Sequence, residues 1–316
     1  MKILVTGGLG YIGGRTAQFL LKLGHQVYLG TRSVRDPPPW APNALVAKMN
    51  WLDSSSLQNA CSKVDMVIHA AGMNAHDCSI DPIAALEFNG LATARLVDSA
   101  YSAGVRRFLY LSSAHVYDAS LRGAITEKTR PLNMHPYSTS HLAGESFVIA
   151  HKNNSSMVGA VLRLSNAFGA PVNKDVNCWM LLVNDLCRQA VITNSIRLRS
   201  AGMQRRDFIT MADVCRAIYH LMNLNNKEIG DGIFNVGSGW TPRVIEIAEI
   251  IQSRCLEILK YKPNILISKE IEVEISQVFS YEINKLKNTD FFLLNNTIEE
   301  IDQTLIFCRN NFKSNK

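Results

Sequence analysis

The chain has 316 residues, of which 47% are hydrophobic and 19% are charged. These values exclude a disordered protein, and the length favours one large domain with a smaller one attached to it. The excess of 33 basic over 27 acidic residues gives a net charge of +6, which indicates anionic ligands only weakly. No basic run is interleaved with aromatic residues, so we expect no nucleic-acid partner.

No segment has the pattern of a targeting signal or a membrane span. The apolar stretch after Lys2 is too short for a signal peptide, and no run reaches the roughly 18 apolar residues that a bilayer requires. The seven cysteines are odd in number and lack a C-x-x-C pair, as is usual for reduced thiols. The histidines do not have metal-ligand spacing. We therefore expect a cytoplasmic protein with no membrane partner and no metal.

Apolar runs of strand length alternate with amphipathic stretches in the first half of the chain. Strands are predicted at 2–6, 26–29, 65–70, 107–112 and 160–163, with helices at 17–23, at 83–103 and from about Ser138 onward. This alternation is typical of an α/β fold with a doubly wound parallel Rossmann sheet. Ligands of such sheets bind at the carboxyl ends of the strands.

The alternation stops at about residues 171–203 and resumes briefly at 206–209 and 232–236. A helix follows at 243–260, then an alternating stretch at 270–278 and a helix near 298–310. We predict a dinucleotide-binding domain at 1–166, to which 204–239 return. Residues 167–203 and 240–316 are predicted to form a smaller, mixed α/β lobe that binds the substrate.

The first predicted strand leads directly into Gly7-Gly8-Leu9-Gly10-Tyr11-Ile12-Gly13. In such a turn, glycine lets the backbone approach a pyrophosphate at the N-terminus of the following helix. Spaced glycines alone also occur in purely structural turns. The preceding strand, Thr6 and a second strand at the expected distance favour a nucleotide site.

With Thr6, this turn resembles the nucleotide fingerprint of the extended short-chain dehydrogenase/reductase family, which comprises NAD(P)-dependent sugar-nucleotide epimerases, dehydratases and ketoreductases. Other stretches resemble the family in the same order over residues 1 to about 240: Val67-Ile68-His69-Ala70-Ala71, Asn89-Gly90, Leu111 to Tyr117, Pro136-Tyr137, Leu162-Arg163 with Asn166 and Gly169, Arg206 to Ile209 with Asp213, and Phe234 to Gly239. The last quarter of the chain matches only loosely.

The resemblance implies a set of cofactor-binding residues: Gly7, Gly10, Tyr11, Ile12 and Gly13 at the pyrophosphate, Ala70, Ala71, Gly72 and Asn89 along the middle of the cofactor, and Asn50 and Trp51 at the adenine. The end of the second strand has no acid before Asp36 but contains Arg32. An arginine there pairs with a 2′-phosphate, so we predict NADP(H), with NAD as the alternative. Arg32 is the expected discriminator, with Arg35 as a second contact. The other interpretation of Arg32 is a solvated loop residue.

In the resembled family a tyrosine transfers the hydroxyl proton, a serine or threonine bonds the same oxygen, and a lysine four residues after the tyrosine lowers its pKa. Tyr137 and Ser113 match, but the fourth residue after the tyrosine is His141. Residues i and i+4 share a helix face, so His141 takes the place of the lysine with a shorter, mostly neutral side chain. Three hypotheses follow: a working enzyme with a modified dyad, an impaired relative that still binds nucleotide, or a different acid–base role for His141. We favour the first.

The resemblance also implies substrate contacts. Arg206 matches a diphosphate-binding arginine, and Asn166 and Asn177 match positions that orient sugar or phosphate groups. His115 is either a substrate contact or a loop histidine bonded to backbone. Ala114 and His115 stand where family dehydratases carry an acidic pair, which disfavours dehydration.

We therefore expect an NAD(P)-dependent oxidoreductase or epimerase that acts at C4 of a nucleoside-diphosphate sugar. The NADP-like second strand slightly favours reduction. The alternative is a catalytically impaired nucleotide-binding or sensing protein of the same fold. Relatives pair through helices that follow Asn89 and Tyr137, so a homodimer is expected.

Overall fold

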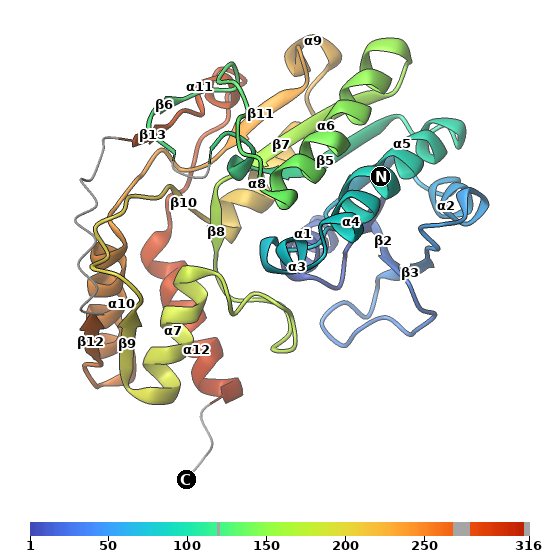
Figure 1. Cartoon of the computed structure of the whole chain (residues 1–316). Coiled ribbons are helices and arrows are strands. Elements are labelled where there is room, and N and C mark those ends of the chain that lie inside the picture. The colour runs from blue at the N-terminus through green and yellow to red at the C-terminus, as the bar shows by residue number, and fades with distance from the viewer. Residues whose placement is uncertain (119–120, 268–278, 313–316) are drawn as a thin grey trace.

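A seven-stranded parallel sheet forms the centre of the larger part of the molecule (Figure 1). The computed structural model describes residues 1–118, 121–267 and 279–312. The strands, in their order across the sheet, are β3 (Leu45–Lys48), β2 (Gln26–Thr31), β1 (Lys2–Thr6), β4 (Met66–His69), β5 (Arg107–Ser113), β7 (Val158–Leu164) and β11 (Ile233–Val236). The order changes direction between β1 and β4, so the ligand crevice of such a sheet lies at the carboxyl ends of these two strands. The predicted doubly wound sheet is confirmed.

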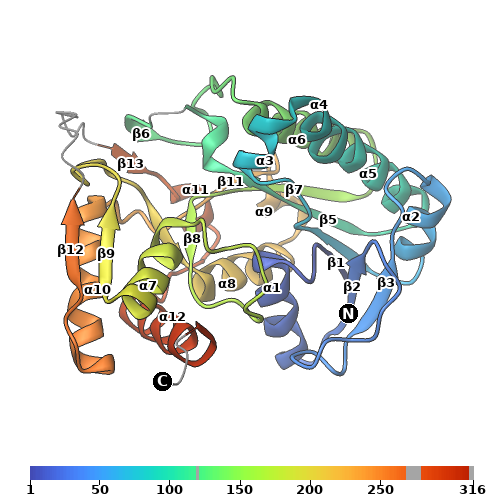
Figure 2. The same cartoon turned by 60° about the horizontal axis from the view of Figure 1, so that its bottom comes forward.

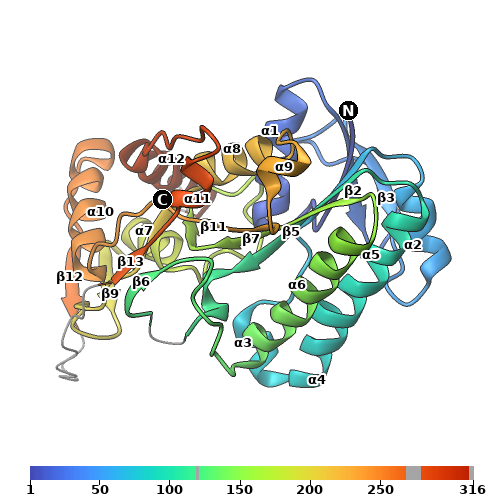
Figure 3. The same ribbon diagram turned by 90° about the horizontal axis from the view of Figure 1, so that it is seen from above.

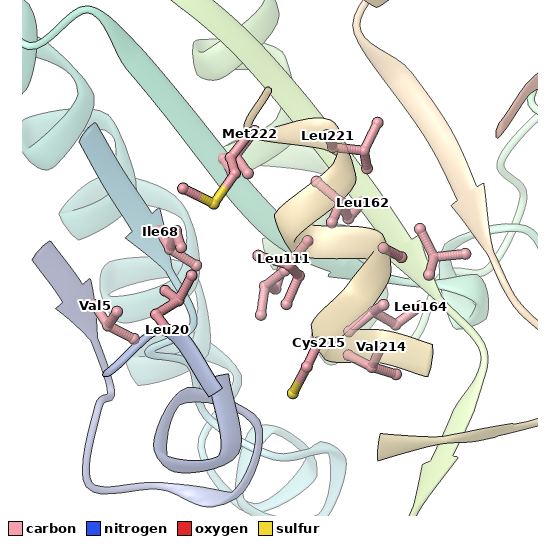
Figure 4. Packing of buried hydrophobic residues seen from close by; sticks show 14 of the residues in the cluster. Val5, Leu20, Ile68, Leu111, Leu162, Leu164, Val214, Cys215, Leu221 and Met222 are labelled. Atoms are coloured by element: carbon pink, nitrogen blue, oxygen red, sulfur yellow. The ribbon is translucent and has the colours of Figure 1, made fainter. Parts of the chain in front are cut away.

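Helices cover both faces of this sheet (Figure 2). On one face α1 (Tyr11–Lys22) packs against α8 (Met211–Leu221), and on the other α5 (Ala92–Ser102) packs against α2 (Ser54–Cys61) and α6 (Pro136–Asn154). Because both faces are covered, the strands are continuous apolar runs. Figure 4 shows how side chains of the strands meet those of α1 and α8 in the core, among them Val5, Ile68, Leu111, Leu162, Leu20, Val214 and Leu221.

A second, smaller hydrophobic core lies beside the sheet (Figures 1 and 2). It is built from α7 (Leu182–Thr193), β9 (Ser195–Leu198), α10 (Val244–Leu259), β12 (Asn264–Ile267) and α12 (Thr297–Phe312). Strands β8 (Asn166–Phe168) and β10 (Phe208–Thr210) pair with each other outside the central sheet. Leu286 and Phe291 belong to the larger core. The last quarter of the chain therefore contributes to both cores, and the division into two lobes at residues 166 and 240 stays a prediction.

The short elements complete the chain. They are α3 (Ala75–Ile80), α4 (Pro82–Ala85), the turn η2 (Ala114–Val116), β6 (Gly123–Ile125), α9 (Asn226–Ile229), β13 (Phe279–Tyr281) and α11 (Asn284–Lys287). β6 and β13 pair in parallel. The alternating stretch predicted at 270–278 lies outside the described residues. Among the helices that the structure describes, none is both long and apolar enough to cross a membrane.

One predicted helix, at 83–103, differs from the structure in its winding. It consists of α4, a π-helical segment η1 (Leu86–Leu91) and α5. The π-helical turn inserts an extra residue and carries Asn89, which is buried. Such turns are frequent at functional sites. The sequence pattern of apolar residues predicted the helix but not this change of pitch.

Candidate active site

The glycine-rich turn between β1 and α1 lies at the carboxyl edge of the sheet, beside the end of β4. Gly7 has a φ of 63°, and a Cβ atom on it would lie 2.9 Å from the carbonyl oxygen of Ala70 and from the amide nitrogen of Ala71. A Cβ atom on Gly13 would lie 2.3 Å from the carbonyl oxygen of Gly7. Only glycine permits these approaches. The turn is closed by the amide of Gly10, which donates to the carbonyl of Gly7 across 2.8 Å.

The first turn of α1 has the properties of an anion site. Its N-cap, Gly10, supplies no side-chain hydrogen bond, and the turn contains no acidic residue. The amide groups at this end have no partner within the helix and lie at the positive end of its dipole. The Tyr11 hydroxyl donates to the carbonyl of Gly169 at 2.8 Å, and Ile12 packs on the core. Since these side chains point into the protein, the main-chain N–H groups fit a dinucleotide pyrophosphate.

The segment after β4 continues the site. Ala70 and Ala71 are half-buried, and Gly72 is exposed. The buried Asn89 supports this segment, because its Oδ1 accepts from the amide of Met73 at 2.8 Å and its Nδ2 donates to Ser140 Oγ at 3.1 Å. The amide group of Asn89 is thus engaged within the protein, and the backbone of the segment is the part left open to a ligand.

The residues predicted for the adenosine end follow strands at the same edge. Arg32 and Arg35 come after β2 and are exposed. Because Gly30 of β2 is paired with Thr6 of β1, Arg32 lies on the side of the glycine-rich turn. Asn50 is exposed, with its Oδ1 accepting from the amide of Leu52. The ring of Trp51 is 5.8 Å from that of His69, at the end of β4.

Ser113, Tyr137 and His141 come together where β5 ends and α6 begins. Ser113 is the last residue of β5, and α6 carries Tyr137 and His141 one turn apart. The side chain of Ser113 lies close enough to that of Tyr137 to influence the pKa of the phenol. The rings of Tyr137 and His141 meet edge to face, with their centroids 4.5 Å apart. The three residues predicted to be catalytic therefore form one cluster.

The electrostatics of this cluster differ from those of a tyrosine beside a cation. Burial raises the pKa of Tyr137, Ser113 lowers it in part, and Cys78 raises it. Burial also lowers the pKa of His141 to about 4, so its imidazole is neutral at physiological pH. In the part of the chain that the structure describes, no lysine or arginine contributes to the pKa shift of Tyr137. The phenol is thus protonated near pH 7.

Three of the four residues predicted to bind substrate lie near one another. Protein atoms crowded around His115 lower the pKa of its imidazole, and the charges of Arg206 and His135 lower it further, although its side chain is partly exposed. Asn166 lies close to the backbone that follows Arg206, because its Nδ2 donates to the carbonyl of Asp207 at 2.8 Å. Asn177 is exposed on the loop between β8 and α7, and the structure shows no interaction that joins it to the other three.

Two buried aspartates hold neighbouring segments through hydrogen bonds. Asp207 accepts from the amides of Ser238 and Gly239, and Asp213 from those of Leu294 and Asn295. Asp53 caps α2 by accepting from the amide of Ser55.

The structure also places residues in the cluster that the sequence did not single out. Tyr110 on β5 is buried, and its hydroxyl lies 2.8 Å from Nδ1 of His141. Beside it, His69 makes two hydrogen bonds, from Nδ1 to Thr6 Oγ1 and from Nε2 to Thr93 Oγ1. Burial lowers the pKa of His69 to about 3, with a further contribution from His141. Tyr110 and His141 are 31 positions apart, so no local pattern indicates this contact.

Metal ligands are not grouped in the described ranges. No cluster of three or more histidine, cysteine, aspartate or glutamate side chains there has the geometry to hold a metal ion. The cluster at the end of β5 is instead made of hydroxyl and imidazole groups beside a turn suited to phosphates, an arrangement that serves proton transfer next to a dinucleotide.

Comparison with known proteins agrees with this arrangement. The dTDP-D-glucose 4,6-dehydratase of Mus musculus is 28% identical over 268 residues, which are 79% of this chain and 72% of the mouse protein. The UDP-glucose 4-epimerase of Thermotoga maritima, solved with UDP-glucose, has a TM-score of 0.83 and 19% identity over 99% of this chain and 100% of its own. RMD from Pseudomonas aeruginosa, solved with NADPH, has a TM-score of 0.79 and 21% identity over 98% and 99% of the two chains.

The two solved structures share the fold at low identity. The family assignment rests on a family model that matches residues 3–237, from the start of β1 to the end of β11, and that is described as the NAD dependent epimerase/dehydratase family. This range contains the glycine-rich turn and the cluster of Ser113, Tyr137 and His141. The chain therefore belongs to the NAD-dependent epimerase/dehydratase family.

Proposed function

We propose that this protein transfers hydride between a nicotinamide dinucleotide and C4 of a nucleoside-diphosphate sugar, in a 4-keto reduction or a 4-epimerisation. The cluster of Ser113, Tyr137 and His141 at the end of β5 is the observation that carries the proposal. The family membership, the mouse dTDP-D-glucose dehydratase and the solved epimerase with UDP-glucose support a nucleotide-sugar substrate.

The residues of the cluster suit reduction. When bound, the reduced nicotinamide supplies a hydride to the carbonyl carbon of the sugar. Tyr137, with its raised pKa, holds the proton that the resulting oxygen anion needs, and Ser113 orients the same oxygen. Solvent then returns a proton to the phenolate. In the reverse direction Tyr137 has to act as a base, which a raised pKa disfavours at neutral pH.

NADP(H) is the proposed cofactor, with NAD as the alternative. Arg32 is exposed at the edge that carries the glycine-rich turn, and no acid precedes Asp36 after β2. A guanidinium there pairs with a 2′-phosphate. The NADPH complex of RMD indicates that this fold accommodates the phosphate.

The substrate would lie between β5, α6 and the loop that bears Arg206. Arg206 is exposed next to His115, where a guanidinium can bind diphosphate oxygens. Asn166 and Asn177 are the further proposed contacts. Asn166 lies next to this segment, whereas Asn177 requires the loop between β8 and α7 to contribute to the site.

A catalytically impaired protein that binds or senses nucleotides is the second candidate. The observation in its favour is the neutral His141, because a neutral imidazole beside Tyr137 does not lower the pKa of the phenol as an ammonium group does. Such a protein would bind the cofactor without turning over any sugar.

A panel of UDP- and dTDP-linked 4-keto and 4-hydroxy sugars, each with NADPH and NADH, tests the proposal. We expect turnover with at least one sugar. The turnover rate should fall about 100-fold or more in Tyr137→Phe, since general acid catalysis contributes 10²–10⁴-fold.

Arg32→Ala should weaken NADPH binding about tenfold or more, the effect of losing charged hydrogen bonds, and leave NADH binding unchanged. Binding without turnover across the panel would favour the second candidate. Tighter binding of NADH that is insensitive to Arg32→Ala would contradict the NADP assignment.

We also propose a homodimer formed through α5, α6 and the adjoining η1. Exposed apolar side chains on these helices support it, including Leu91 and Phe147, each 45% exposed.

A reducing, cytoplasmic environment is proposed as well, because all seven cysteines are buried and free.

A further inference from the structure

Tyr110 is completely enclosed, and three neighbours fix the position of its ring and its hydroxyl. Its ring stacks on that of His69, with centroids 5.4 Å apart and an interplanar angle of 25°. The hydroxyl lies 2.8 Å from Nδ1 of His141. Gly144, one turn after His141 on α6, makes room for it, since a Cβ atom there would be 2.8 Å from the Tyr110 hydroxyl oxygen. The phenol is therefore locked against one particular nitrogen of His141.

The hydrogen bonds around Thr93 determine which atoms of Thr6, His69 and Thr93 donate a proton. Thr6 Oγ1 accepts from the amide of Ala71, so its own proton goes to Nδ1 of His69. His69 then carries its proton on Nε2 and donates to Thr93 Oγ1 across 2.9 Å. Thr93 gives its proton to the carbonyl of Asn89 at 2.7 Å. Thr93 thus has no proton left for Tyr110.

The Tyr110 hydroxyl can give its proton to Nδ1 of His141, because the two atoms are 2.8 Å apart. A phenol is more acidic than an imidazole N–H, and an imidazole nitrogen is more basic than a phenol oxygen. The preferred bond runs from the Tyr110 oxygen to Nδ1, which leaves the proton of a neutral His141 on Nε2.

The Nε2 atom of His141 faces the proposed cofactor site. A Cβ atom on Gly72 would be 3.9 Å from Nε2 and 3.8 Å from Cε1 of the same ring. Nε2 has no hydrogen-bond partner among the described residues. It is not among the fully buried atoms without a partner, so part of its surface is accessible. It is therefore open toward the exposed Gly72.

We propose that Tyr110 is a positioning residue that fixes the Nε2–H tautomer of His141 and aims this uncharged donor at an oxygen of the bound dinucleotide beside Gly72. The inference rests on the proposed cofactor site. In this arrangement His141 donates a hydrogen bond to the cofactor, as a cationic side chain would, but it carries no charge. Tyr110 itself touches neither cofactor nor substrate and acts only through His141.

Nitrogen-15 NMR of the ligand-free protein tests the tautomer without any cofactor. Long-range proton–nitrogen spectra of the whole labelled chain, with His141 assigned from His141→Gln, should show a protonated Nε2 and an unprotonated Nδ1. In Tyr110→Phe, which keeps the stacked ring, the His141 signals should become those of exchanging tautomers. A protonated Nδ1 in the wild type, or an unchanged tautomer in Tyr110→Phe, would overturn the proposal.

Titration with NADPH and NADH tests the consequence for binding. One lost hydrogen bond corresponds to about a 3- to 10-fold weaker affinity, and we expect this for Tyr110→Phe and for His141→Leu. The double variant should be no weaker than His141→Leu alone, because both changes remove the same donor. Additive losses would indicate a merely structural role for Tyr110 and contradict the proposal. Tyr101→Phe, which changes an exposed tyrosine, is the matched control and should bind as the wild type does. If the wild type binds neither dinucleotide, the proposed function fails while the NMR result stands.

Discussion

At the scale of single residues, the chemistry of the site depends on position 141. The buried imidazole of His141 is neutral, and the pKa of the neighbouring Tyr137 is raised. In the proposed reaction, oxidation of a sugar hydroxyl would require the phenolate of Tyr137, whereas reduction would require the phenol. The two directions of the proposed reaction should therefore respond oppositely to pH.

His141→Lys tests this dependence. In the wild type, the rate of hydroxyl oxidation should rise with pH throughout the range in which the protein is folded, because more of the phenol ionises as the pH increases. A lysine ammonium within about 4–6 Å of the phenol lowers a pKa by about 1 to 3 units, so the pH–rate curve of the variant should move to lower pH by that amount. The measurement is kcat for oxidation against pH in both proteins.

His141→Gln is the control for this change, since it replaces the imidazole without adding charge and should leave the pH–rate curve in place. Superimposable curves for the wild type and His141→Lys would mean that ionisation of Tyr137 does not limit the oxidation.

Single residues also show how far the sequence predicts the site. The motifs predicted Ser113, Tyr137 and His141, and the structure brings them together because α6 packs against β5. The contact of Tyr110 with His141 was not predictable, since it depends on the depth at which α6 packs on β5 and on the space left by Gly144. Asn89 was predicted as a cofactor contact from the motif alone, but its amide is used to hold the backbone at Met73.

At the scale of elements, the parallel strands were predictable and their partners outside the sheet were not. Buried runs such as Ile3 to Val5 are apolar at every position, and this pattern identifies a strand covered on both faces. β10 was predicted from the alternation near Ile209, but its pairing with β8 rather than with the central sheet is a tertiary effect. The π-helical turn at Leu86–Leu91 likewise carries Asn89 in tertiary contacts, with Met73 and Ser140, that no local pattern indicates.

A contact between α1, which follows the glycine-rich turn, and α12, which belongs to the smaller core, depends on Glu300. Glu300 is 4% exposed, and its carboxylate accepts from Arg15 at 2.9 Å and from the amide of Ala212 at 3.1 Å. Glu300→Gln removes the charge that compensates Arg15. We expect a loss of about 1.5 to 3 kcal/mol in the free energy of unfolding, as for other hydrogen bonds to charged groups. Urea denaturation followed by circular dichroism measures it.

The neighbouring Glu299 provides a matched control for that variant. It is exposed on the same turn of α12, so Glu299→Gln should change the free energy of unfolding by no more than about 0.5 kcal/mol. Equal losses in the two variants would show that the pairing with Arg15 does not stabilise the contact between the helices.

At the scale of the whole molecule, the surface is divided between the site and the helical face that we propose for dimerisation. The glycine-rich turn and the cluster at Tyr137 lie at the carboxyl edge of the sheet. Figure 3 shows α5 and α6 side by side on one face of the sheet, with α4 near them. Gly90 brings η1 against Ala143 of α6, so Leu91 and Phe147 project from adjoining helices. A partner on this face would buttress α6, which carries Tyr137 and His141.

The dimer is tested by introducing charge on this face. In a two-fold interface each substitution occurs twice, and a carboxylate buried there without a partner is costly. We expect the wild type to be a dimer by size-exclusion chromatography with light scattering, and Leu91→Glu combined with Phe147→Glu to be a folded monomer. Leu52→Glu, at a side chain that is 82% exposed near the end of β3, should remain a dimer. A monomeric wild type would contradict the proposed dimer. A double variant that still dimerises would show that the interface lies on another face. Because a dimer holds α6 from outside, the monomeric variant should also lose part of its cofactor affinity, which the NADPH titration measures.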